Sequence, residues 1–200
     1  MNIITLLLLL SISLAQASVV GISTHPLGEE ARVLSAELTG YMSQRQEMAM
    51  GLRYTQEVDP YTLIDVTASG GQDARGLQLG AGADFALLRE DIYQPRVSIK
   101  PTFQFQKYEA YSASLLGVAP TIRKGFSANG FEFFPFVAVP AGMKINNAND
   151  NFVYYASLSL GASMPFPGAA SEKLLLSVEA NMDMGATSDY LGCLVSWVWN

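Results

Sequence analysis

Few side chains in the sequence could perform covalent or metal chemistry. There is one histidine, His25, and one cysteine, Cys193. They fall short of the three or four ligands that a zinc site takes, and one cysteine cannot form an internal disulfide bond. His25 precedes the first convincing strand, so we expect a solvated residue rather than a general base. Cys193 is interpreted as a small hydrophobic side chain. We therefore expect no metal, no cofactor and no enzymatic activity.

The carboxylates also fail to form a catalytic pair. Glu179 and Asp183 share one strand face but lie roughly 13 Å apart along an extended chain, too far to share a proton. We expect them to pair instead with Lys100, Arg123 or Lys144. The oxygen-rich segment 146–150 lacks the spacing and glycine of a calcium-binding loop, and it is interpreted as a polar hairpin turn.

These residues are carried by segments in which apolar and polar side chains alternate with a period of two. This alternation is typical of strands with two different faces. Connections rich in glycine, proline or asparagine separate the segments. We predict an all-β protein, an antiparallel up-and-down barrel of about ten strands, or eight if the region 27–45 begins as a helix. The predicted strands are 33–42, 47–56, 61–68, 77–87, 96–106, 113–123, 131–145, 152–163, 174–184 and 190–199.

Charge distribution indicates which face of these strands meets lipid. Only 15% of the residues are charged, and the net charge of −6 does not suit a nucleic-acid-binding surface. The apolar face of the clearest strands carries no charged residue, as expected for side chains that point into hydrocarbon. The polar face carries nearly balanced acids and bases, which a narrow lumen requires because each ion removed from water needs a partner. The predicted lumen network is Glu37, Arg53, Asp65, Asp84, Arg96, Lys100, Arg123, Glu132, Lys144, Glu179 and Asp183.

Aromatic residues gather near the ends of the predicted strands, which is typical of the two aromatic girdles of a transmembrane barrel. One expected girdle contains Tyr54, Tyr61, Phe131, Phe133, Trp197 and Trp199. The other contains Phe103, Phe105, Phe152, Tyr154 and Tyr190.

The first 17 residues read as a secretory signal peptide. An apolar run leads to Ala15-Gln16-Ala17, a small-x-small cleavage pattern. This run is shorter than the about 20 residues of a membrane-spanning helix. We therefore expect a signal peptide over 1–17, an N-terminal segment over 18–32 and a transmembrane barrel over 33–200.

The last strand resembles the C-terminal insertion signal of bacterial outer-membrane barrels. In that signal a polar or aromatic residue is followed by glycine and then by alternating bulky residues that end in an aromatic. Tyr190, Gly192, Val195 and Trp197 occupy these positions, although Asn200 follows the last aromatic. The chain thus resembles small outer-membrane barrels of OmpA/OmpX-like architecture. The resemblance implies an outer-membrane location, contact with membrane lipid and recognition by the barrel-insertion machinery.

Barrels of eight to ten strands have an interior just wide enough for side chains to fill. The leading hypothesis is therefore a monomeric, non-enzymatic barrel with a filled lumen and a structural role in the envelope. A narrow porin-like channel for ions or small solutes is the second hypothesis. A soluble periplasmic barrel that binds an apolar ligand is the third, and it would require the two faces to be exchanged.

Overall fold

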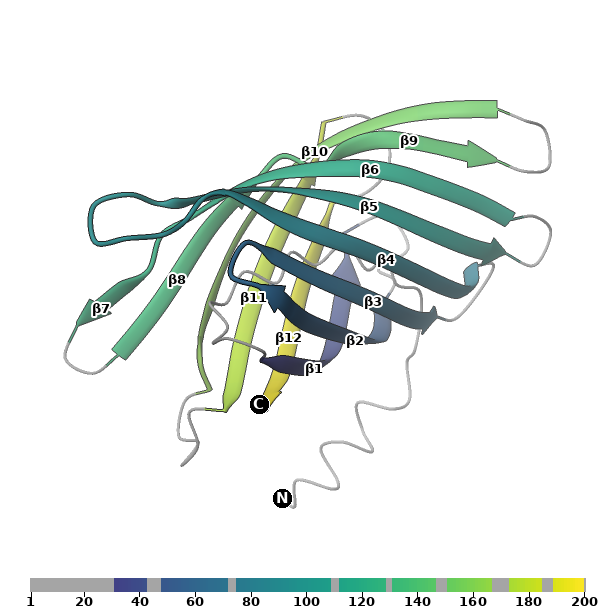
Figure 1. Ribbon diagram of the computed structural model, residues 1–200. Helices are drawn as coiled ribbons and strands as arrows, with labels where there is room; N and C mark the ends of the chain where they lie inside the picture. The colour runs from purple at the N-terminus through teal and green to yellow at the C-terminus, as the bar shows by residue number, and fades with distance from the viewer. Residues whose placement is uncertain are drawn as a thin grey trace, which may run out of the picture.

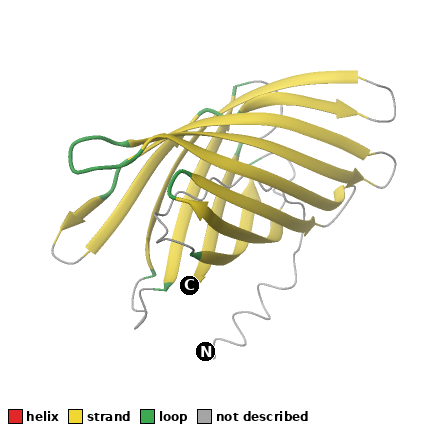
Figure 2. Ribbon diagram, in the orientation of Figure 1, coloured by secondary structure: helices red, strands yellow, loops and turns green. Residues whose placement is uncertain are grey.

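The computed structural model describes residues 31–42, 48–71, 75–108, 112–128, 131–146, 151–166, 173–184 and 189–199. The expected signal peptide, His25 and most of the segment 18–32 lie outside the described residues. In the part of the chain that is described, the regular structure is entirely β (Figure 2). None of the described segments is a helix long and apolar enough to cross a membrane.

Strands follow one another along the chain as predicted (Figure 1). Their bounds are β1 Arg32–Tyr41, β2 Met48–Asp59, β3 Thr62–Gly71, β4 Arg75–Leu88, β5 Arg96–Tyr108, β6 Ser112–Arg123, β7 Phe126–Ala128, β8 Phe131–Ala138, β9 Ala141–Asn146, β10 Asn151–Pro165, β11 Leu174–Asp183 and β12 Tyr190–Trp199.

The strands form a closed antiparallel barrel of ten strands. From β1 to β6 each strand pairs with the next along the chain, as do β10, β11 and β12. β12 pairs with β1 from Tyr190 to Trp199, which closes the ring. Because β1 is a strand from Arg32 onward, the barrel has ten strands and the eight-strand alternative is wrong. We call the end where β1 begins and β12 ends the proximal end, and the opposite end distal.

One barrel position is shared by two short strands, β8 and β9, which both lie between β6 and β10. The sequence predicted one strand over 131–145, but Pro140 interrupts it because proline has no N–H to donate. The ladder continues across the break. The N–H of Val139 donates to the carbonyl of Pro120 at 3.0 Å, and the N–H of Ser157 donates to the carbonyl of Pro140 at 2.8 Å.

The connection after β6 also differs from the prediction. The predicted strands leave 124–130 as a connection, whereas residues 126–128 of this segment form β7. β7 makes a hairpin with β8 that projects beyond the neighbouring strands (Figure 1).

The barrel is polar inside and apolar outside. On β2, Arg53 is 1% exposed, whereas the preceding residue, Leu52, whose side chain points to the other face of the sheet, is 57% exposed. The same alternation places Asp65 inside, and Ile64 and Val66 outside, on β3. This arrangement is the reverse of what the soluble-barrel hypothesis requires, since a soluble protein hides its apolar side chains.

Candidate functional site in the barrel lumen

Arg53 lies midway along β2, with its side chain buried in the lumen. Its guanidinium donates to the Oε2 atom of Glu37 at 3.1 Å, from β2 to β1. Both side chains are almost completely buried. Charge-assisted hydrogen bonds of this kind are stronger than neutral ones, and each partner offsets the cost of removing the other from water.

A second ion pair spans three strands. The Nζ atom of Lys100 on β5 lies 3.0 Å from the Oδ2 atom of Asp65 on β3, and β4 runs between them. Gly82 of β4 allows the two side chains to meet across β4. A Cβ atom at Gly82 would lie 2.8 Å from the carboxylate of Asp65 and 2.9 Å from the side chain of Lys100. The glycine therefore leaves the space through which the two side chains meet.

Glu179 on β11 completes this central cluster. Its Oε1 atom accepts a hydrogen bond of 2.9 Å from the hydroxyl of Tyr190 on β12. The negative charges of Glu179 and Asp65 both attract the positive charge of Arg53. Tyr190 is buried, so its predicted place in an aromatic girdle is wrong. It shares the inward face of β12 with Gly192, and its hydroxyl finds a partner there.

Further ion pairs lie toward the proximal end. Arg96 lies 3.5 Å from Asp84. Arg123 donates to Glu90 from Nε at 3.2 Å and from its terminal nitrogen at 3.1 Å. Glu90 belongs to the connection between β4 and β5, and its carboxylate also accepts a hydrogen bond from the backbone of Gly125.

The same connection is held by a lysine. The ammonium of Lys124 donates to the carbonyls of Ile92 at 3.0 Å and Gln94 at 3.3 Å, and to that of Asp91. Together with Glu90, these bonds tie the segment 89–95 to the start of the β7–β8 hairpin.

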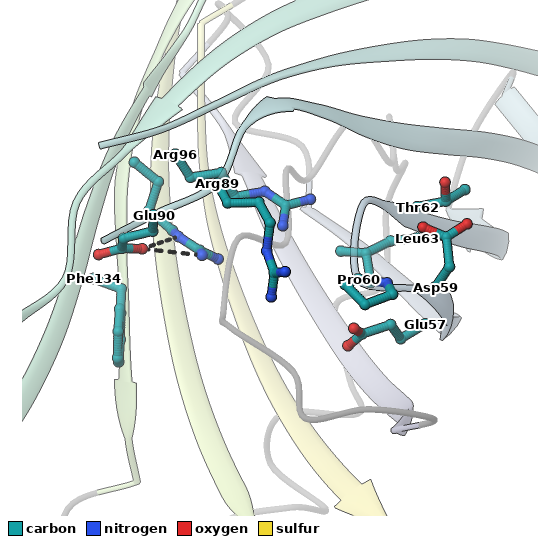
Figure 3. A pocket seen from close by; sticks show the side chains of 10 residues that line it. Glu57, Asp59, Pro60, Thr62, Leu63, Arg89, Glu90, Arg96 and Phe134 are labelled. Carbon is teal, nitrogen blue, oxygen red and sulfur yellow. Dashed lines mark hydrogen bonds and ion pairs between the residues drawn. The ribbon is translucent and has the colours of Figure 1, made fainter. Parts of the chain in front are cut away.

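A cavity of about 310 Å³ lies at the proximal end of the lumen (Figure 3). Its lining residues are Glu57, Asp59, Pro60, Thr62, Leu63, Arg89, Glu90, Arg96, Arg123 and Phe134. The lining combines three arginines with three acids around a space at the lower end of small-molecule pocket sizes. Glu90 lies beside the arginines and pairs with Arg123, whereas Glu57 and Asp59 lie on the other side (Figure 3). Such a balanced lining can hold water and ions without favouring one sign of charge.

The opposite wall of the lumen carries hydroxyl groups. Ser163 of β10 bonds to Ser177 of β11, and the amide of Asn181 donates to Ser157 at 3.0 Å and to Ser159 at 2.6 Å. A similar bond of 2.8 Å joins Ser35 and Ser196 across the β1–β12 seam. Neutral hydrogen bonds therefore satisfy these serine and asparagine side chains.

Large aromatic side chains lie directly against glycines on the lumen face of the strands. A Cβ at Gly161 would meet the ring of Phe136, and one at Gly142 would lie 2.8 Å from the hydroxyl of Tyr155. Tyr155 also covers Gly117. Glycine in these strands creates room for bulky neighbours.

The structure places most of the predicted lumen residues inside. Glu37, Arg53, Asp65, Asp84, Arg96, Lys100, Arg123 and Glu179 are buried or nearly so, and the register puts Lys144 and Asp183 on the inward face. The prediction is wrong for Glu132. This residue is exposed because it lies in the β7–β8 hairpin, outside the closed wall.

Two lumen acids were missed by the sequence analysis. Glu57 is buried and continues the inward series of Arg53 and Thr55, so alternation could have found it. Glu90 lies in an irregular connection, where alternation gives no signal.

The other predicted aromatics lie on the outward face. Tyr54 packs near Trp199 at the proximal end, with ring centroids 6.3 Å apart. Tyr154 and Trp197 are exposed. The remaining outward aromatics are Phe103, Phe105, Phe152, Phe131 and Phe133. Tyr61 is exposed in the turn between β2 and β3, with the guanidinium of Arg89 5.2 Å from its ring centroid. Of the expected insertion signal, Tyr190 and Gly192 face the lumen, while Val195 and Trp197 face outward.

Nothing in the described ranges groups three or more histidine, cysteine or acidic side chains in a way that could hold a metal ion. Cys193 is partly buried on the outward face.

No family model matches the sequence, and no curated protein matches it. Three solved structures are similar in fold. An outer-membrane channel from Pseudomonas putida F1 is 8% identical, with a TM-score of 0.48, and the match covers 92% of this chain and 100% of that one. LpxR from Salmonella typhimurium is 10% identical, with a TM-score of 0.45 and coverage of 88% and 86%. The KdgM porin, solved with a disordered oligogalacturonate, is 7% identical, with a TM-score of 0.41 and coverage of 85% and 99%. The chain is a closed ten-strand antiparallel β-barrel, and the solved structures to which it is similar include outer-membrane barrels.

Proposed function

We propose that this protein is a monomeric, non-enzymatic β-barrel of the bacterial outer membrane, with a lumen closed by its own side chains and a structural role in the envelope. The burial of the central lumen residues carries the proposal. Water in an open pore would contact the polar side chains that line it, yet Arg53 is 1% and Ser159 0% exposed. The apolar exterior, which suits contact with lipid, and the expected signal peptide support the location.

The absence of enzymatic activity is proposed from the partners of the lumen nucleophiles. Ser163 and Ser177 bond to each other, and Ser157 and Ser159 accept from Asn181. None of these partners is a base that activates a hydroxyl near neutral pH. We expect membrane lipid and, during assembly, the insertion machinery to be its partners.

Conductance in planar bilayers tests the closed lumen. The wild-type protein should insert without stepwise currents, whereas Glu37→Ala combined with Arg53→Ala should conduct, because it removes both central side chains of one ion pair together. Fractionation to the outer membrane and heat-dependent gel mobility provide the control for insertion and folding. Steady stepwise conductance of the wild-type protein would overturn the closed lumen in favour of the narrow channel.

A further inference from the structure

The hairpin formed by β7 and β8 presents a face made of phenylalanine. Phe126 pairs with Phe133, and Phe131 lies two positions before Phe133 on the same strand. Residues directly opposite in an antiparallel pair share a face, as do alternate residues of one strand. The three rings therefore lie on one side of the hairpin. Phe126 is 58% and Phe131 51% exposed.

This phenylalanine face continues the apolar exterior of the barrel. Val137 lies on the same side of β8 as Phe131 and Phe133, and it is exposed. It pairs with Leu160 of β10 and with Ile122 of β6, which are also exposed on the outside of the barrel. The lipid-facing surface thus runs without interruption from the closed wall onto the hairpin.

The opposite side of the hairpin is polar. Ser127 pairs with Glu132, and both residues are exposed. A charged carboxylate is costly to bury in an apolar environment, so this side favours water and lipid headgroups. The hairpin is amphipathic: its apolar face continues the apolar exterior of the barrel wall, and its polar face is on the opposite side.

The hairpin lies outside the closed wall. β8 pairs with β10 only from Phe134 onward, and with β6 only from Phe136 onward. The segment that carries Phe131 and Phe133 therefore has β7 as its sole strand partner among the described residues, and the hairpin projects from the proximal end (Figure 1). A two-stranded hairpin is marginally stable in water by itself, and aromatic side chains favour the membrane interface.

We propose that the β7–β8 hairpin lies in the interfacial layer of the membrane leaflet at the proximal end, with Phe126, Phe131 and Phe133 among the lipids and with Ser127 and Glu132 toward water. The occupant of the phenylalanine face is lipid because this face is continuous with the lipid-facing wall. The inference rests on the proposed function, since it requires a barrel that spans the membrane.

Spin labels can test this placement in the full chain, folded into phosphatidylcholine vesicles. In a Cys193→Ser background, single cysteines are introduced by Phe126→Cys and Phe131→Cys on the phenylalanine face. Ser127→Cys is the matched control on the opposite face of the same hairpin, and Leu160→Cys is the control in the barrel wall. Each label is scored by its accessibility to oxygen, which concentrates in lipid, relative to a water-soluble nickel chelate.

We expect the oxygen-to-nickel ratio to be several-fold higher at positions 126 and 131 than at position 127, and highest at position 160. Equal, low ratios at 126, 131 and 127 with a high ratio at 160 would overturn the hairpin placement but leave the membrane barrel intact. Exclusion of both reagents at 126 and 131 would also overturn it, because protein rather than lipid would cover the face. A low ratio at position 160 would overturn the spanning barrel itself and the inference with it.

Discussion

The two walls of the lumen differ in the interactions that join their buried polar side chains. On the wall formed by β1 to β5, ion pairs bridge the strands, and Lys100 reaches Asp65 over the intervening β4. On the wall formed by β10 to β12, short hydroxyl and amide side chains bond mostly to the strand beside them. Ion pairs with long side chains fill the centre of a barrel, whereas short hydroxyl groups stay against its wall. In the proposed closed lumen, the charged wall is therefore the part that fills the centre.

Breaking the central ion pair should have the largest effect on the free energy of unfolding. Arg53→Met leaves the buried carboxylate of Glu37 without its arginine, and we expect a loss of about 3–5 kcal/mol. Urea-induced unfolding in lipid vesicles measures it. Glu37→Met combined with Arg53→Met should lose much less, because it removes both members of the ion pair and leaves no carboxylate at position 37. A double variant as unstable as the single one would mean that packing, rather than charge pairing, holds this wall.

Filling the glycine gap should have an intermediate effect. Gly82→Ala places a Cβ within 3 Å of both Asp65 and Lys100, and overpacking of this kind costs about 1–3 kcal/mol. Gly70→Ala is the matched control, since a Cβ there meets nothing within 4 Å. Equal unfolding midpoints for the two variants would show that the ion pair does not need the gap.

Removing one hydroxyl should have the smallest effect. Ser163→Ala leaves Ser177 without its neutral hydrogen bond, and we expect a loss of about 0.5–1.5 kcal/mol in the same unfolding assay. Ser163→Ala combined with Ser177→Ala should have nearly the same free energy of unfolding as Ser163→Ala alone. A loss as large as that of Arg53→Met would remove the energetic distinction between the two walls.

The difference between the walls also explains what the sequence could predict. Alternation located the strands and placed Arg53, Asp65 and Lys100 inside, because side-chain direction in a strand depends only on position. It did not reveal that Lys100 would pair with Asp65, since that choice depends on register across three strands and on the gap at Gly82.

The wrong predictions have equally specific causes. Tyr190 was assigned to the exterior for its residue type, although it alternates in step with Gly192 and Ser196, which face inward. Glu132 alternates correctly along its strand, but that part of the strand leaves the barrel wall. Alternation gives the face on which a residue lies and does not show where the wall ends.

The seam between β1 and β12 has a kinetic consequence. It joins strands from opposite ends of the described chain, so the ring cannot close before the last strand is available. Contacts between residues this distant in sequence form slowly. Until they form, both edges of the open sheet expose backbone hydrogen-bonding groups that can pair with another chain. We expect the seam to set the interval during which the unfinished barrel is most prone to aggregation.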